Sequence, residues 1–442
     1  MGDHTFHGGV HPAEHKELSC KAPLVPYMPK GELVFLMNQH IGKPAAPIVQ
    51  KGDRVLAGQR IAEATGFVSA NIFSSVSGTV KAIEPRPTAA GPMAQAIVIT
   101  PDGENTLAEG IGTQTNYLDL TNQEILDRIK AAGIVGMGGA GFPTHVKLTV
   151  KDPNKIRYVI ANGAECEPYI TCDDQLMQTH AEEIVTGIEI ILRLFPQAHG
   201  VVCIENNKPD AIAAMKAACE GRGRISVMPM KTKYPQGGER SLISVVASRH
   251  LKLGMLPADA GCVVDNVASI RAVYRAVCLN EPLMERGVTV SGDSVKNPGN
   301  FWVKIGTSSR ELVDACGGWN EGLEPEKILS GGPMMGIPLV NLDVPICKNN
   351  NAITALSVDP VSAAPMTACL RCGRCNRVCP LGLSPQLMQV AAQHKDYERY
   401  EKRLYGLECI ACGCCTYICP AKRPLMQLFK VTKAEIMATK KR

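Results

Sequence analysis

Hydrophobic residues along this 442-residue chain change their spacing several times, and the changes predict different kinds of folded unit. Residues 43–83 are short apolar runs separated by Gly-Asp, Ala-Gly and Ser-Gly turns, which is typical of short β-strands. From about 120 to 285, short apolar runs alternate with segments of helical periodicity, which indicates an α/β core. A helix is expected to begin this core at Thr121, because Glu124 follows it in a capping-box pattern.

The α/β core contains two short, continuous apolar runs and two segments of helical periodicity. We expect buried strands at 156–161 and 200–204, and helices at 181–194 and 210–219. A glycine-rich stretch, residues 136–141, lies between the first helix and the first of these strands.

A smaller unit is expected after the α/β core. The pattern predicts strands at 288–291 and 301–305, around the turn Asn297-Pro298-Gly299, and a helix at 309–316 that packs on them. This arrangement indicates a small β-grasp-like α+β unit. Residues from about 345 to 368 are rich in Pro, Ala, Asn and Ser and predict a linker.

Two cysteine runs near the C-terminus carry the strongest chemical signal. Each has the spacing C-x2-C-x2-C-x3-C-P, the first over 369–380 and the second over 409–420. This is the ligand pattern of a pair of [4Fe–4S] clusters, in which the fourth cysteine of each run usually binds the other cluster. The ligands are therefore assigned in two sets: Cys369, Cys372, Cys375 and Cys419 for one cluster, and Cys409, Cys412, Cys415 and Cys379 for the other.

Zinc and disulfide bonds are the alternative uses of these cysteines. Structural zinc sites usually take two CxxC pairs, without a third cysteine at the same step. A disulfide scaffold is expected in a short secreted chain, whereas this chain is long and its first residues, 1–16, are polar and His-rich with no apolar signal region. Helical patterns at 384–392 and 397–407, between the two runs, favour an α-helical ferredoxin-like domain.

The charge is divided unevenly along the chain. From Cys369 to the end there are 14 Lys/Arg against 5 Asp/Glu, while the remainder has 33 against 37. A basic cluster domain offsets the negative charge of thiolate-ligated clusters, and it could attract an acidic electron donor or an anionic membrane surface. Nucleic acid is disfavoured because the domain lacks interleaved aromatic residues. No apolar run approaches the length that spans a bilayer, so we expect a soluble or peripheral protein.

The glycine-rich stretch matches G-x-G-x-x-G, but its surroundings differ from those of a Rossmann loop. The Rossmann fingerprint follows a strand, whereas here a helix is expected before it and Pro143 follows soon after. A bare turn without a ligand is a second alternative. A loop whose amides hold a phosphate or a flavin ring, just before a helix, is the better account. Lys147 would lie one turn into that helix, near the phosphate or the flavin.

Four stretches of the α/β core resemble the FMN-binding, NADH-oxidising subunit of respiratory complex I. They are GIVGMGGAGFPTHVKL, NGAECEPY, YPQGGERSL and VVDNVASI. Residues 47–83 resemble a biotinyl/lipoyl-type barrel-sandwich domain, but the stretch around Phe67 lacks the hairpin-tip lysine that carries a cofactor. With the two cysteine runs, the whole chain resembles the RnfC family, the C subunits of Rnf electron-transport complexes.

The resemblance implies a set of cofactor-binding residues but no catalytic residue, because FMN itself mediates hydride transfer. Three positions depart from the complex I pattern: Ala164 replaces Asp, Gly238 replaces one Glu, and Asp265 replaces one Asn. These departures affect the nicotinamide pocket more than the flavin site. The residues implied around FMN are Gly136, Gly138, Gly139, Lys147, Asn162, Glu165, Gly237, Gly238, Glu239 and Asn266.

The resemblance also implies a domain order within a multidomain α/β and α+β chain. The expected parts are an N-terminal region with a barrel-sandwich hybrid (1–118), an α/β domain binding FMN and NAD(H) (119–286), a β-grasp domain (287–345), a linker (346–365) and a domain with two [4Fe–4S] clusters (366–442).

In function, the resemblance implies a peripheral subunit of a membrane-bound, ion-translocating ferredoxin:NAD oxidoreductase. It would exchange hydride between NAD(H) and FMN and relay single electrons through two [4Fe–4S] clusters. Its partners would be the other Rnf subunits, including an iron–sulfur subunit and integral membrane subunits, with ferredoxin acting indirectly. The location would be the cytoplasmic side of the cell membrane. Two alternatives remain: a soluble flavin and iron–sulfur reductase such as a cobalamin reductase, and a non-catalytic wiring scaffold.

Overall fold

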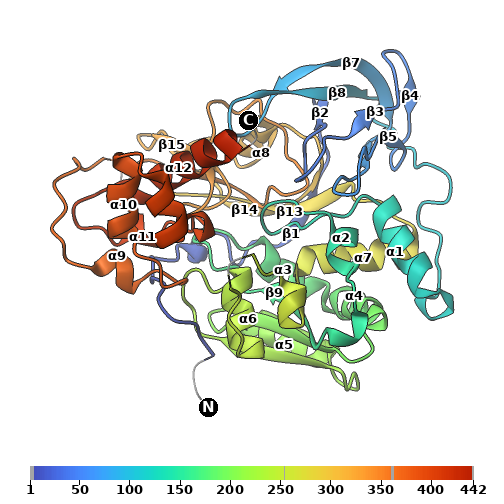
Figure 1. Cartoon of the computed structure of the whole chain (residues 1–442). Helices are drawn as coiled ribbons and strands as arrows, with labels where there is room; N and C mark the ends of the chain where they lie inside the picture. The colour runs from blue at the N-terminus through green and yellow to red at the C-terminus, as the bar shows by residue number, and fades with distance from the viewer. Residues whose placement is uncertain (1–3, 253, 360–362, 441–442) are drawn as a thin grey trace.

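The chain folds into four units that pack around one another, as the computed structural model shows for residues 4–252, 254–359 and 363–440 (Figure 1). A β-rich unit from the N-terminal region and an α/β unit in the middle of the chain lie on opposite sides of a six-stranded sheet, which is the third unit. The helical C-terminal unit, drawn in red, lies beside all of these at one end of the molecule. Among the described residues, no helix combines the length and apolar character needed to cross a bilayer.

The N-terminal β-rich unit contains two small sheets that enclose an apolar core. Leu33, Ile97 and Ile99 are fully buried in that core, and Ile97 and Ile99 lie on the same face of their strand because side chains alternate. One sheet has the order β2 (Leu33–Leu36), β8 (Met93–Pro101), β7 (Gly78–Pro87) and β4 (Arg54–Val55), and the other the order β3 (Ala46–Pro47), β5 (Arg60–Glu63) and β6 (Ile72–Phe73).

The tip loop of this unit contacts the α/β unit. The Phe67 ring packs edge-on against His145, with ring centroids 6.3 Å apart, and the Phe67 carbonyl lies 3.3 Å from His145 Nε2. His145 belongs to helix α2 (Thr144–Leu148), which follows the glycine-rich stretch. The position where a lipoyl domain carries its cofactor is therefore a docking contact here.

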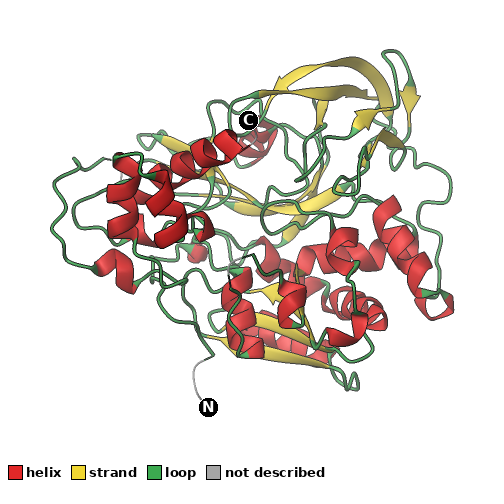
Figure 2. Ribbon diagram, in the orientation of Figure 1, coloured by secondary structure: helices red, strands yellow, loops and turns green. Residues whose placement is uncertain are grey.

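The α/β unit is built on a four-stranded parallel sheet with helices on both faces (Figure 2). Both faces are buried, which explains the continuous apolar runs in the sequence. Val159 packs with the cluster formed by helices α4 (Ala181–Leu194) and α7 (Val267–Leu279), while Ile160 packs with α6 (Glu239–Ala247). The strand order is β11 (Ile225–Met230), β10 (His199–Glu205), β9 (Tyr158–Gly163) and β12 (Cys262–Asn266), and helix α5 (Pro209–Ala218) joins β10 to β11.

The helix predicted before the glycine-rich stretch is α1 (Asn122–Ala131), and its capping box is formed. The Glu124 amide donates to Thr121 Oγ1 at 3.2 Å, and the Thr121 amide donates to the Glu124 carboxylate at 2.7 Å. The glycine-rich stretch therefore connects two helices, α1 and α2, and does not follow a strand as a Rossmann loop would.

The predicted β-grasp strands and helix are present as β13 (Glu285–Ser291), β14 (Gly299–Lys304) and α8 (Ser309–Ala315). The sheet is larger than expected because β1 (Leu24–Tyr27) from the N-terminal region pairs with β14 in parallel. The complete order is β1, β14, β13, β17 (Ala352–Leu356), β15 (Lys327–Ser330) and β16 (Ile337–Pro338).

The expectation of a linker over 346–365 is wrong at β17. All five residues of this strand are buried, and the strand lies between β13 and β15 in the middle of the sheet. The apolar run of β17 is short, and the sequence on either side is rich in Asn and Pro. The composition of the segment therefore predicted a linker instead of a strand. Residues 360–362 of the expected linker lie outside the described residues.

The C-terminal unit is helical, as predicted, and α10 (Pro385–Gln393) and α12 (Leu425–Lys440) form its core. The second helical segment expected between the cysteine runs is a π-helical turn, Arg399–Arg403, followed by a 3-10 turn, Gly406–Glu408. Two short helices, α9 (Arg374–Arg377) and α11 (Cys414–Tyr417), lie within the cysteine runs.

Candidate cofactor sites

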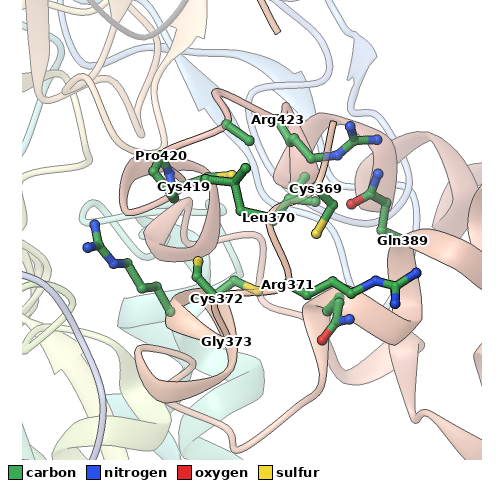
Figure 3. A pocket seen from close by; sticks show the side chains of 14 residues that line it. Cys369, Leu370, Arg371, Cys372, Gly373, Gln389, Cys419, Pro420 and Arg423 are labelled. Carbon is green, nitrogen blue, oxygen red and sulfur yellow. The ribbon is translucent and has the colours of Figure 1, made fainter. Parts of the chain in front are cut away.

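Four cysteines from both runs line one cavity at the outer end of the helical unit, which we call the outer cavity (Figure 3). In Figure 3 the side chains of Cys369, Cys372 and Cys419 lie around one space, which Arg371 and Arg423 also line. Two of the four cysteines, Cys369 and Cys372, are exposed. The four are Cys369, Cys372, Cys375 and Cys419, which is the first set assigned from the sequence.

The second set of cysteines lines a separate cavity, which we call the inner cavity. It contains Cys379, Cys409, Cys412 and Cys415. Three of them are buried and Cys409 is partly buried, in contrast to the outer set. Cys414 also borders this cavity, and its thiol lies beside the Cys412 thiol and 3.9 Å from the Tyr234 carbonyl.

The two cysteine runs have matching backbone conformations, forty residues apart. Arg371 and Ala411 have φ angles of 54° and 53°, and Gly373 and Gly413 have φ angles of 70° and 82°. Left-handed backbone at these positions turns each C-x2-C loop around its cavity and starts the short helix that follows. Both cavities therefore have the same local construction.

The spacing of the sulfurs differs from that of a zinc site. Tetrahedral zinc with sulfur ligands at about 2.3 Å brings the sulfurs to within about 3.8 Å of one another. Among the described residues, no three of these cysteines have sulfurs that all lie within 4.8 Å. All eighteen cysteines are free of disulfide bonds. The cavities therefore suit a ligand larger than a single ion.

The candidate flavin site lies at the carboxyl ends of the parallel strands, where α/β sheets commonly bind ligands. Asn162 of β9 and Asn266 of β12 are register partners at this edge. Asn162 Nδ2 donates to the Gly237 carbonyl at 2.9 Å, which brings the Gly237-Gly238 turn to the same place. Asn266 accepts from the Ala268 amide and so caps helix α7.

The glycine-rich stretch approaches this edge closely. A Cβ atom on Gly138 would lie 2.9 Å from Asn266 Nδ2, so glycine is required there. Gly138 and Gly139 are exposed, and a Cβ on Gly139 would meet no atom within 4 Å. The Met137 amide donates to Ser269 Oγ at 2.8 Å, which holds the loop against α7. The loop thus presents its exposed backbone above the strand ends.

Lys147 brings positive charge to the same site. Its ammonium donates to the Val264 carbonyl at 2.8 Å and lies 3.6 Å from Asp265 and 3.9 Å from Glu239. Asp265 is buried, and neither of its carboxylate oxygens has a hydrogen-bond partner among the described residues. Burial raises the pKa of Asp265 and of Glu239, and the nearby Lys147 ammonium opposes both shifts.

Glu165, expected at the flavin edge, has its carboxylate committed to the N-terminal turn of helix α3 (Cys172–Thr179). The carboxylate accepts from the Asp173 amide at 2.7 Å, and the Lys16 ammonium lies 3.9 Å away. Burial raises the pKa of Glu165, and Lys16 opposes this rise. The structure thus groups nine of the ten expected flavin residues around the glycine-rich stretch, while Glu165 organises the adjoining loop.

Sequence patterns did not single out the junction between this site and the inner cavity. The Tyr234 hydroxyl, which is buried, donates to the Cys412 carbonyl at 2.8 Å. Arg240, at the start of α6, forms an ion pair with Glu408 at 2.6 Å. Tyr234 and Arg240 flank the Gly237-Gly238 turn. Their position in the flavin-type motif was therefore the only sequence feature that could have pointed to this junction.

Four family models match successive parts of the chain. They describe an RnfC barrel sandwich hybrid domain at residues 4–104, a Nuo51 FMN-binding domain at 129–275, an SLBB domain at 288–338 and a 4Fe-4S dicluster domain at 365–420. This order confirms the predicted fold class and defines a flavin-dependent, iron–sulfur electron-transfer protein.

Curated relatives match the chain over nearly its full length. The C subunit of a proton-translocating ferredoxin:NAD(+) oxidoreductase complex from Clostridium ljungdahlii is 44% identical, over 99% of this chain and 95% of the relative. The C subunit of a Na(+)-translocating complex from Acetobacterium woodii is 40% identical, over 99% and 98%. The C subunit of an ion-translocating oxidoreductase complex from Rhodobacter capsulatus is 42% identical, over 98% and 83%. The chain belongs to the RnfC family of Rnf complexes.

A solved structure shares the fold at much lower identity. An NAD+-reducing [NiFe]-hydrogenase in the H2-reduced state matches with a TM-score of 0.51 and 19% identity. The match covers 73% of this chain and 62% of the hydrogenase chain.

Proposed function

We propose that this chain is the peripheral, cytoplasmic-side subunit of a membrane-bound, ion-translocating ferredoxin:NAD oxidoreductase. It exchanges hydride with NAD(H) at a bound FMN and relays single electrons through two [4Fe–4S] clusters to a neighbouring iron–sulfur subunit. The names of its relatives and the order of its four domains support this assignment. The near full-length relatives favour this assignment over a soluble reductase, and the match to an FMN-binding domain favours it over a flavin-free scaffold.

The candidate flavin site has groups that suit FMN. The exposed backbone of Gly138 and Gly139 and the Lys147 ammonium suit an anionic phosphate or the electron-rich edge of the ring. The Asp265 carboxylate, whose oxygens accept no hydrogen bond among the described residues, suits the hydroxyl groups of a ribityl chain. Asn162, Asn266 and the Gly237-Gly238 turn close the site from the strand ends.

A bound flavin supplies the exchange between two-electron hydride chemistry and one-electron chemistry. The residues of the site therefore need to hold and orient the ring and the nicotinamide and to exclude water. No proton-transferring side chain is required for hydride exchange.

The two cysteine cavities suit one [4Fe–4S] cluster each, with the ligand sets exchanged between the runs. The inner cavity adjoins the flavin site through the Tyr234–Cys412 hydrogen bond and the Arg240–Glu408 ion pair. The outer cavity has exposed cysteines. We therefore order the relay as flavin site, inner cavity, outer cavity and then the partner subunit.

The observation that carries this proposal is the convergence of one flavin-type site and two four-cysteine cavities in a single chain. The experiment is an anaerobic absorbance titration of the purified, reconstituted chain with NADH. Bleaching of a flavin band by NADH is expected. A chain that binds FMN without responding to NADH would contradict hydride exchange. The peripheral location is tested separately, by expressing the chain with the membrane subunits and asking whether it purifies with them.

A further inference from the structure

The back of the glycine-rich stretch is held by residues outside the segment that matches the FMN-binding family model, residues 129–275. Three of its carbonyl groups, those of Met137, Gly139 and Gly141, accept hydrogen bonds from other parts of the chain. The donors are Arg286 Nη1 at 3.0 Å, Asn349 Nδ2 at 3.1 Å and the Ile41 amide at 3.2 Å.

These donors are themselves fixed. The Arg286 side chain is 1% exposed and also donates to the Lys348 carbonyl at 2.8 Å. The Lys348 side chain is fully buried, and its Nζ donates to the Gly133 carbonyl at 2.7 Å and the Asn71 carbonyl at 2.5 Å. Lys348 therefore joins the barrel-sandwich unit, the turn at Gly133 that precedes the glycine-rich stretch, and the segment before β17. We call Arg286, Lys348, Asn349 and the Ile41 amide the brace.

Carbonyl oxygens carry partial negative charge, so a loop that binds an anion or an electron-rich ring must turn them away from the ligand. Anchoring alternate carbonyls from behind achieves this before the ligand arrives. A Cβ on Gly141 would lie 3.3 Å from the Gln39 carbonyl and 3.6 Å from Asn349 Cβ, so the contact with the brace is close.

We infer that Asn349, with Arg286 and the Ile41 amide, is a positioning residue for the cofactor, which holds the glycine-rich stretch in its ligand-binding conformation from the six-stranded sheet and the N-terminal β-rich unit. This inference rests on the proposed FMN site. Asn349 touches the loop carbonyl and lies outside the described flavin pocket, so its effect on FMN is indirect.

The test is Asn349→Asp in the full chain, which keeps the side chain's size but replaces the donor to the Gly139 carbonyl by a carboxylate. Asn349 is partly exposed, so folding should survive the change. Asn350→Ala is the matched control, because Asn350 lies in the same segment and contacts Ser330 and Cys347 but not the loop.

We expect Asn349→Asp to weaken FMN binding by about threefold to tenfold or more, because the hydrogen bond to the Gly139 carbonyl is lost and the new carboxylate repels that carbonyl. The visible circular dichroism of bound FMN should also change, whereas the thermal midpoint of the FMN-free protein should stay at the wild-type value. FMN affinity and spectrum equal to those of the Asn350→Ala control would overturn the inference. If Asn349→Asp lowers the thermal midpoint, the test uses Asn349→Ala instead, which only removes the donor. FMN affinity and spectrum are then compared with those of the Asn350→Ala control in the same way. If the wild-type protein binds no FMN, the proposed function is itself contradicted, and the inference that rests on it is contradicted too.

Discussion

Arg240 and Glu408 form an ion pair, 2.6 Å long, between the flavin-binding unit and the residue that precedes Cys409. The Arg240 and Glu408 side chains are only 25% and 16% exposed, so the pair is more shielded from solvent than the surface pairs of this chain. Its place beside the Gly237-Gly238 turn makes it a structural connection between the candidate flavin site and the inner cavity. Because Glu408 engages the Arg240 guanidinium, this arginine is committed to the domain junction.

Breaking this ion pair should slow electron transfer without emptying the flavin site. We expect Arg240→Gln to cost about 1 kcal/mol at the junction, because a partly buried carboxylate loses its partner. After mixing with NADH, flavin bleaching should keep its rate while cluster reduction slows severalfold in stopped-flow absorbance. The control is Arg310→Gln, since the Arg310–Asp343 pair is 52% and 67% exposed and far less shielded. The double variant Arg240→Glu/Glu408→Arg should restore part of the rate of cluster reduction. If Arg240→Gln reduces its clusters at the wild-type rate, the ion pair has no role in electron transfer.

The exchanged ligand sets predict which cysteine variants behave alike. Cys375→Ala and Cys419→Ala share the outer cavity and should each lose the same cluster, although they lie in different runs. Iron content should fall from about eight to about four atoms per chain in both. Cys379→Ala should lose the other cluster and so leave a different electron paramagnetic resonance spectrum. Matching spectra for Cys375→Ala and Cys379→Ala, which lie in the same run, would show that the ligands are not exchanged.

Lys147→Ala should weaken FMN binding by about tenfold or more, because a charge-assisted contact to the cofactor is lost. Asp265, which is buried 3.6 Å from the Lys147 ammonium, would also lose its nearest cation. Fluorescence quenching of free FMN gives the dissociation constant. Lys151→Ala, an exposed lysine just beyond α2, serves as the control. Stoichiometric FMN at wild-type affinity in Lys147→Ala would contradict this role.

Lys348 should give the chain a measurable pH dependence. Burial lowers its pKa from 10.5 to about 7, so between pH 7 and 10.5 the unfolded state binds the extra proton. The contribution of this group to stability therefore increases as the pH rises through that range, by about 1.4 kcal/mol per pH unit.

Lys348→Met removes this titration. Its thermal midpoint should move down relative to wild type as the pH is raised from 7.5 to 9.5, because only the wild type gains stability from Lys348. The midpoints are measured by circular dichroism under identical anaerobic conditions. A difference between the two proteins that stays constant with pH would contradict the lowered pKa.

Local spacing explains what the sequence could predict. Each cluster motif spans about a dozen residues, and the capping box of Thr121 and Glu124 spans four, so both are visible without knowledge of the fold. The flavin-type loop was visible for the same reason. The strand β17 was missed because its five residues are stabilised by β13 and β15, far away in sequence, within a segment of linker-like composition.

Contacts between distant segments account for the other differences. Asn349 and Gly139 are 210 residues apart, and nothing in the local sequence of either indicates their hydrogen bond. Glu165 matched a motif position, but the direction of its carboxylate depends on Lys16 and on the first turn of α3, which only the folded chain brings together. Side-chain direction at a motif position is therefore harder to predict than the motif.

The central claim is that electrons pass from the flavin site through the inner cavity to the outer one. The most direct test is reduction of the remaining cluster by NADH in Cys379→Ala, with Cys419→Ala and wild type measured beside it by electron paramagnetic resonance. In Cys379→Ala, dithionite should reduce the outer cluster but NADH should not, whereas in Cys419→Ala NADH should still reduce the inner cluster. Reduction of the outer cluster by NADH at the wild-type rate in Cys379→Ala would contradict this order of electron transfer.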